Sequence, residues 1–201
     1  KEAHIISNPI TAQSYTSLMV LCTDGTLHSC GQNTYGQIGN STVTQAGNFT
    51  PVSQNAIKFW NVFTSGDRYT SHIGLGATYG DSLTDGTTVS SSTNILTQTP
   101  VKFRVFFWGY AGDYQDGENQ NTNRTVPTEI TTFYNNNHNV VQCVPTRHSW
   151  FALTSAGVLF GWGYPYGGHL GNGTTSTTQA VTQIDTDVAE IVSTRSSNGN
   201  S

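Results

Sequence analysis

The chain has 201 residues, a net charge of −4 and only 10% Asp, Glu, Lys and Arg, compared with about 25% in an average soluble domain. This composition offers no basic surface for nucleic acid, and no apolar run reaches the ~18 residues of a membrane span, so we expect neither nucleic-acid binding nor membrane insertion. An aromatic content of 11% favours a folded core over disorder. The cysteines are odd in number and lack metal-ligand spacing, which predicts buried free thiols rather than a disulfide for Cys22 and Cys30, with Cys143 as the third.

The N-terminal part of the chain is predicted to form a hairpin followed by a long loop. Ser17–Leu21 is a short apolar strand, Thr23-Asp24-Gly25 forms a turn in which glycine accepts a positive φ, and the return strand ends at Gly31. A loop rich in Gly and Asn follows, and Pro51-Val52 restarts extended structure. We expect a last strand at Phe59–Phe63 to close this unit.

The same order of features recurs along the rest of the chain. The first strand returns at Ser71–Leu75 and Ser149–Leu153, the aromatic–Gly pair returns at Trp108-Gly109 and Trp162-Gly163, and closing strands are expected at Val140–Val144 and Val188–Val192. No amphipathic helix is apparent. Repeats of this size, each with about four short strands, predict an all-β chain that forms a β-propeller of four-stranded antiparallel blades.

The spacing of these features gives a period of about 54 residues with two irregular intervals. Ser17 and Ser71 are 54 positions apart, but the hairpin expected after Leu75 is absent, and Phe103 runs directly into the next strand. Either a hairpin and most of a blade were deleted in evolution, or about 35 residues of the real polypeptide are missing from the sequence. We favour the second interpretation, because both apparent deletions cut strands rather than loop tips. Separately, the chain starts at Lys1 rather than Met and looks like a processed product or an incomplete part of a longer chain.

We therefore divide the chain into a lead-in segment, 1–13, and about four propeller repeats, 14–201. The repeats are 14–66, 67–103, 104–144 and 145–201, and the second and third are incomplete.

These repeats resemble those of the regulator of chromosome condensation family of β-propellers. The residues that carry the resemblance are Thr23-Asp24-Gly25 through Tyr35-Gly36-Gln37-Ile38-Gly39, and His148-Ser149 through Trp162-Gly163 and Leu170-Gly171-Asn172-Gly173. Cys30 departs from the pattern, because the family has Trp there, and Thr16 and Thr70 replace its His. The resemblance implies that the chain is part of a larger, seven-bladed ring. The family's founding activity, nucleotide exchange on a small nuclear GTPase coupled to chromatin binding, is not carried over by any residue of this chain.

A second resemblance lies in the use of Thr, Asn, Ser, Gly and Tyr, as in 162–175, which looks like propeller repeats in bacteriophage tail-fibre and surface proteins. It implies a non-enzymatic structural or adhesion module at a virion or extracellular surface, within a larger oligomeric assembly. Such a module is expected to bind other virion subunits, or a host surface glycan or protein. The alternative is an intracellular protein-interaction propeller, including a guanine-nucleotide exchange factor for a small GTPase.

No catalytic, metal or cofactor site is predicted, because the histidines are scattered without ligand spacing. His148 lies at the repeat's His position, where we expect a hydrogen bond within the blade. Ser149 follows it, but Ser17 and Ser71 occupy the same repeat position, so a structural hydroxyl explains all three better than a nucleophile. A hydrolase or lyase acting on glycans is disfavoured, since no pair of acidic residues recurs.

Binding residues are predicted in the loops that follow the aromatic–Gly pairs. An exposed Tyr combines apolar area with a hydrogen-bonding tip, so a ring of loop tyrosines could stack on sugars or pack against a partner, whereas the alternative is packing between blades. The candidates are Tyr35, Tyr110, Tyr114, Tyr164 and Tyr166. The acidic loop with Asp113, Asp116 and Glu118 lacks the spacing of a calcium loop, so we predict a solvated turn there.

Overall fold

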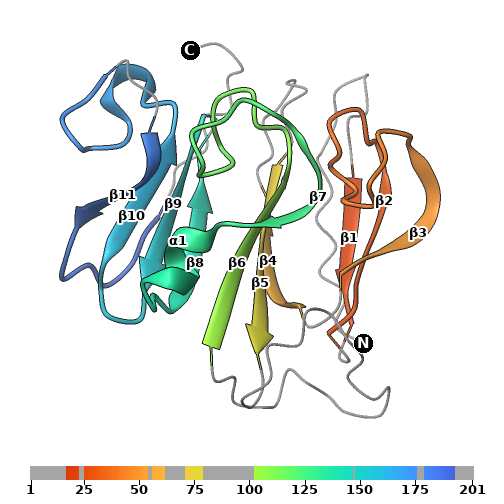
Figure 1. Cartoon of the computed structure of the whole chain (residues 1–201), viewed down its shortest axis with the longest axis horizontal. Helices are drawn as coiled ribbons and strands as arrows, with labels where there is room; N and C mark the ends of the chain where they lie inside the picture. The colour runs from red at the N-terminus through yellow and green to blue at the C-terminus, as the bar shows by residue number, and fades with distance from the viewer. Residues whose placement is uncertain are drawn as a thin grey trace.

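The computed structural model describes residues 17–22, 25–53, 56–61, 71–78, 102–146, 148–175 and 179–192. They form three antiparallel sheets, which we call blades 1, 2 and 3, arranged side by side (Figure 1). Blade 1 consists of β1 (Ser17–Leu21), β2 (Leu27–Gly31) and β3 (Ala46–Ser53). Blade 2 consists of β4 (Ala56–Asn61), β5 (Ser71–Thr78), β6 (Lys102–Gly109) and β7 (Arg124–Glu129). Blade 3 consists of β8 (Val140–Pro145), β9 (Ser149–Thr154), β10 (Leu159–Gly163) and β11 (Gln179–Asp185).

Neighbours in sequence are neighbours in each sheet, as in propeller blades. The prediction of an all-β chain with antiparallel blades is therefore confirmed, with four strands in blades 2 and 3 and three described strands in blade 1. The structure adds one short helix, α1 (Thr131–Asn135), and a single 3-10 turn at Tyr166–Gly168. Elements this short give no periodic signal in a sequence.

The two central strands of each blade form a hairpin with one common register. The first residue of one strand pairs with the last residue of the next: Ser17 with Gly31, Ser71 with Gly109, and Ser149 with Gly163. These partners are 14 positions apart in blades 1 and 3 but 38 apart in blade 2. The central hairpin of blade 2 thus carries 24 additional residues, shared between longer strands and a longer connection.

This register overturns the prediction of missing segments after Leu75 and Phe103. The two segments are each other's partners, since β5 pairs with β6 along its whole length. With the 24 residues set aside, the period of 54 is intact, so one insertion explains both irregular intervals. The repeat boundaries 67–103 and 104–144 cut this hairpin in two, and the described residues form three blades where about four repeats were expected.

The strands that were expected to close each unit instead begin a blade. Phe59–Phe63 overlaps β4 and Val140–Val144 lies in β8, each of which is the first strand of its sheet. The last strands of blades 1 and 2 are β3 and β7, which contain Pro51 and Pro127. Proline suits this edge position, because it lacks an N–H for a further strand.

The predicted strand at Val188–Val192 is not a strand in the structure. The Ile191 backbone is instead hydrogen-bonded to β8 through both polar atoms of the Gln142 side-chain amide. Gln142 Nε2 donates to the Ile191 carbonyl at 2.7 Å, and the Ile191 N–H donates to Gln142 Oε1 at 3.2 Å.

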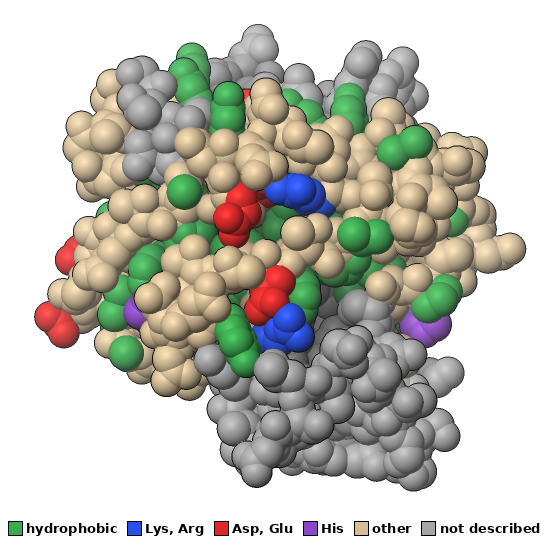
Figure 2. All heavy atoms as spheres, viewed as in Figure 1, with side chains coloured by type: hydrophobic (Ala, Val, Ile, Leu, Met, Phe, Trp, Pro, Cys, Tyr) green, Lys and Arg blue, Asp and Glu red, His purple; other side chains and the backbone are tan. Residues whose placement is uncertain are grey.

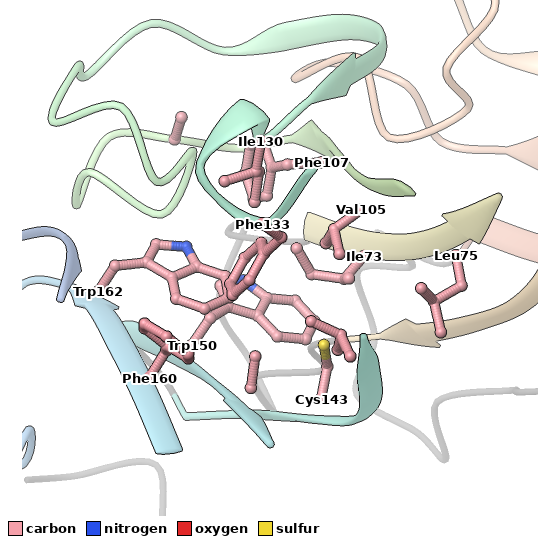
Figure 3. Packing of buried hydrophobic residues seen from close by; sticks show 13 residues of the cluster. Ile73, Leu75, Val105, Phe107, Ile130, Phe133, Cys143, Trp150, Phe160 and Trp162 are labelled. Carbon is pink, nitrogen blue, oxygen red and sulfur yellow. The ribbon is translucent and has the colours of Figure 1, made fainter. Parts of the chain in front are cut away.

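The main hydrophobic core fills the space between blades 2 and 3 (Figure 3). Trp150 and Trp162 of blade 3 face Ile73 and Phe107 of blade 2, and all four are buried. Phe133 of α1 lies between the blades, with its ring edge-to-face with Phe160 at 5.5 Å and with Trp162 at 5.8 Å. A smaller cluster joins blades 1 and 2 and consists of Met19, Leu21, Leu27 and Trp108.

Candidate functional site

Three long loops leave β2, β6 and β10 at the same end of the blades, at the top of Figure 1. They are 32–45, 110–123 and 164–175, and we call their surface the loop face. Their backbones follow one path, because positive φ values recur at equivalent positions. The first set is Gly36 (80°), Tyr114 (63°) and Gly168 (83°), the second is Gly39, Gly117 and Gly171, and the third is Ser41, Asn119 and Gly173.

Two of these loops, 32–45 and 110–123, are each anchored by a tryptophan of the following blade. The Trp108 indole N–H donates to the Gln37 carbonyl at 3.1 Å, and the Trp162 indole N–H donates to the Gln115 carbonyl at 2.8 Å. Both tryptophans are fully buried. Cys30 occupies the corresponding place in blade 1, opposite Leu18 of β1. A buried hydrogen bond of this kind fixes the loop relative to the next blade.

At the boundary between blades 1 and 2, the loop side chains are aromatic and apolar. Tyr35 meets Tyr110 edge-to-face, with ring centroids 5.3 Å apart, and both rings are half-buried. Ile38 is completely buried beneath them in the same loop. The Ser41 N–H also donates to the Thr125 carbonyl of β7 at 2.8 Å.

At the boundary between blades 2 and 3, equivalent positions hold polar groups. Asp113, the equivalent of Tyr35, lies with its Oδ2 at 2.8 Å from Nδ1 of His148, and these side chains keep 26% and 20% of their surface exposed. Because a carboxylate only accepts hydrogen bonds, Nδ1 carries the proton. The expectation of a hydrogen bond within the blade is therefore wrong, since His148 bonds to the neighbouring blade.

An aromatic cluster surrounds this pair. The Tyr166 ring has three ring neighbours, with centroid distances of 5.7 Å to His148, 6.3 Å to Tyr164 and 6.2 Å to His169. Its side chain remains 53% exposed. We call Asp113, His148, Tyr164, Tyr166 and His169 together the Tyr166 cluster.

The structure thus groups four of the five predicted tyrosines into two pairs, Tyr35 with Tyr110 and Tyr164 with Tyr166. Tyr114 is half-buried at a glycine-like φ of 63°. The first pair spans two blades, whereas the second lies in one loop. Their role in ligand binding stays a prediction.

The sequence predicted a solvated turn around Asp116, and for this residue the prediction is wrong. Asp116 is 2% exposed and occupies the position of Ile38 in blade 1 and Leu170 in blade 3, which are also buried. Its Oδ1 accepts the N–H groups of Glu118 and Gln120 at 3.0 and 3.2 Å, and its Oδ2 pairs with Nη2 of Arg124 at 2.6 Å. The carboxylate is buried, and local N–H donors together with Arg124 of β7 compensate its charge.

Two of the three repeat serines have structural hydrogen bonds, whereas the described residues offer no partner to the buried Ser17 hydroxyl. Ser149 Oγ donates to the Tyr164 carbonyl at 2.6 Å, and Ser71 Oγ accepts the Trp150 indole N–H at 3.3 Å. A structural rather than nucleophilic serine was predicted, and these bonds agree with it.

The cysteines are all free thiols, as predicted, but only Cys143 is buried, and Cys22 and Cys30 are partly exposed. Within the described ranges, no group of three or more His, Cys, Asp or Glu side chains could hold a metal ion. In that same part of the chain, no helix has the length and apolarity needed to cross a bilayer. Much of the displayed face is uncharged, with few acidic or basic side chains (Figure 2).

The antiparallel blades and their anchored loops define a segment of a β-propeller. Among solved structures, the chain is similar to Prp20p from Saccharomyces cerevisiae, in work that also describes its binding to Gsp1p and histones, with a TM-score of 0.56, 16% identity, and coverage of 85% of this chain and 36% of that chain. It is likewise similar to yeast RCC1 (Prp20) in a complex with Kap60, with a TM-score of 0.55, 15% identity, and coverage of 85% and 35%. No protein-family model matches the sequence. At this identity the comparison shows the shared propeller fold, and the chain spans about a third of the length of the yeast structures it matches.

Proposed function

We propose that this chain is part of a propeller of the regulator of chromosome condensation type and acts as a non-enzymatic protein-interaction module. The observation that carries the proposal is the loop face, in which the bonds from Trp108 and Trp162 hold the backbones of loops 32–45 and 110–123 in place. A surface that is ordered before binding loses less entropy when a partner docks. The similar yeast propeller is described together with protein partners, Gsp1p, histones and Kap60, and this supports a protein ligand for this chain.

A role without catalysis is supported by how the reactive side chains are used. Ser149 donates its hydroxyl to a backbone carbonyl, and the buried Asp116 is occupied by Arg124 and two backbone N–H groups. His148 is oriented by Asp113 across a blade boundary. Each group has a structural partner that explains its position.

A second candidate is an adhesion module of a virion or other extracellular surface, with a host glycan or neighbouring subunits as ligand. The low charge of the chain and the half-exposed Tyr166 favour it, because hydroxyl, amide and aromatic groups suit such ligands. Both candidates use the loop face, and they differ in the partner.

Site-specific photo-cross-linking tests the loop face directly. A photoreactive amino acid replaces Thr34, which is exposed on this face, and the matched control replaces Ser155, which is exposed at the turn between β9 and β10 at the other end of the blade. We expect the Thr34 probe, but not the Ser155 probe, to capture a partner in the native source. Capture by Ser155 alone contradicts the proposal.

Two assays then separate the candidates. Stimulated nucleotide release from a small GTPase by the purified protein identifies an exchange factor within the first class. Co-purification with virions, with Thr34 cross-links to a surface subunit or glycoconjugate, identifies the second class.

A further inference from the structure

We propose that the Tyr166 cluster is a binding site for a neutral, hydroxyl-rich ligand of the carbohydrate class. The inference rests on the proposed use of the loop face in binding, and it names one ligand class for one place on that face.

The aromatic rings supply a surface for the apolar side of a sugar ring. Tyr166 is 53% exposed although three rings lie within 6.3 Å of its centroid. A pyranose has a C–H face that packs on an aromatic ring and hydroxyls around its edge. Tyrosine provides both parts of such a contact, an apolar face and a hydrogen-bonding tip.

The Asp113–His148 pair supplies hydrogen-bond acceptors beside that ring. Since Nδ1 of His148 donates to Asp113, Nε2 is the ring nitrogen left to face a ligand. The carboxylate accepts further bonds through its remaining lone pairs. Both side chains are partly exposed, so hydroxyl donors of a ligand can reach them.

The same groups are less suited to a cationic ligand. A Lys or Arg side chain is also attracted to tyrosine rings. However, the carboxylate of Asp113 is already engaged by the His148 N–H, so it is not a free counter-charge for such a ligand. A hydroxyl shares the carboxylate without displacing the histidine.

The position of Tyr166 stays at the surface when a neighbouring blade is present. Its equivalent in blade 1 is Thr34, which is exposed although blade 2 packs against blade 1. In blade 2 the equivalent is Gly112, where a Cβ would lie 2.0 Å from the Tyr110 hydroxyl. This loop position therefore holds Thr in blade 1, Gly in blade 2 and an aromatic residue in blade 3.

Ligand-observed NMR with the whole chain and a panel of methyl glycosides tests the inference. We expect saturation transfer from the protein to at least one glycoside, with affinity weakened about 5- to 10-fold in Tyr166→Ala. Tyr166→Phe keeps the ring and should stay within about threefold of the parent protein. The matched control is Phe49→Ala, since Phe49 is a similarly exposed aromatic (48%) on β3, and it should leave the affinity unchanged.

Equal glycoside binding by Tyr166→Ala and the parent protein overturns the inference. So does tighter binding of Nα-acetyl-arginine amide than of every glycoside, which assigns the cluster to a basic side chain. If no glycoside binds while the Thr34 probe still captures a protein partner, this inference fails and the proposed function stands.

Discussion

The two blade boundaries share one architecture and differ in chemistry. In both, a buried indole donates to the carbonyl of a loop glutamine, Trp108 to Gln37 and Trp162 to Gln115. Around this common bond, Tyr35 packs on an aromatic neighbour in one boundary, whereas the equivalent Asp113 pairs with a histidine in the other. The tryptophans and the positive-φ positions thus hold the scaffold together, whereas partly exposed positions such as Tyr35 and Asp113 differ in chemistry between the two boundaries.

Removing a tryptophan should have the largest effect and rank the two boundaries. Trp162→Ala deletes a buried side chain from the large core between blades 2 and 3, and we expect a loss of about 3–5 kcal/mol in the free energy of unfolding. Trp108→Ala should cost less, because Trp108 belongs to a smaller cluster. Urea denaturation measures both values, and the reverse order would contradict the assignment of the main core to the second boundary.

The buried carboxylate of Asp116 gives the next effect. Asp116→Ala strands Arg124, whose side chain is 22% exposed, and should cost about 3 kcal/mol. The double variant Asp116→Leu, Arg124→Leu copies the apolar Ile38 of the first boundary and should recover most of that loss. Thermal and urea unfolding of the single and double variants test this, and a double variant no more stable than the single one refutes it.

Acid should weaken the first boundary before the second. Complete burial lowers the pKa of His72 from 6.5 to about 3, and its ring packs on Trp108 at 5.4 Å. Below about pH 6.5 His72 binds a proton in the unfolded chain but stays neutral in the folded chain. The free energy of unfolding therefore falls by about 1.4 kcal/mol for each unit by which the pH is lowered from 6.5 to 3.

Between pH 7 and 5 this contribution amounts to about 2 kcal/mol. The control is His72→Phe, which keeps an aromatic ring and should lose this part of the pH dependence. Urea unfolding at pH 7, 6 and 5 measures it, and parallel curves for both proteins would show that His72 does not titrate as expected.

A pair of glycine substitutions gives the smallest and most local comparison. Gly36 and Gly168 both have a positive φ, of 80° and 83°. A Cβ at Gly36 would lie 2.7 Å from the Thr125 backbone of blade 2, whereas one at Gly168 meets Thr175 at an ordinary 3.7 Å. In both alanine variants the left-handed conformation should lower the free energy of unfolding by about 1 kcal/mol.

Gly36→Ala should therefore be less stable than Gly168→Ala by a further 1–2 kcal/mol, roughly. The difference in their unfolding midpoints measures the contact with the next blade. Equal midpoints would show that blade 2 yields to the added methyl group.

Local sequence signals predicted the propeller because they act within one hairpin. The turn glycines Gly25 and Gly157 have φ of 78° and 76°, and the strand from Ser17 to Leu21 alternates between buried and half-buried side chains. Such patterns need no knowledge of the neighbouring blade.

The errors arose where distant segments meet. Spacing alone did not show that β5 pairs with β6, so one insertion looked like two deletions. Asp113 and His148 are 35 positions apart and belong to different blades, and no motif links them. The polar loop around Asp116 predicted a solvated side chain, whereas the fold buries it and pairs it with Arg124 of β7.

The lengths of the two kinds of connection have a consequence for how such a chain can vary. The loops after β2 and β6 each contain 14 residues, whereas the connections between central strands contain 5, 23 and 4. The two loops of the first kind are bonded to the next blade by Trp108 and Trp162, whereas the connections of the second kind differ more than fourfold in length within this one chain. A ring of these blades can therefore accept insertions between the central strands, at the end opposite the loop face, while the loops of the loop face vary by substitution.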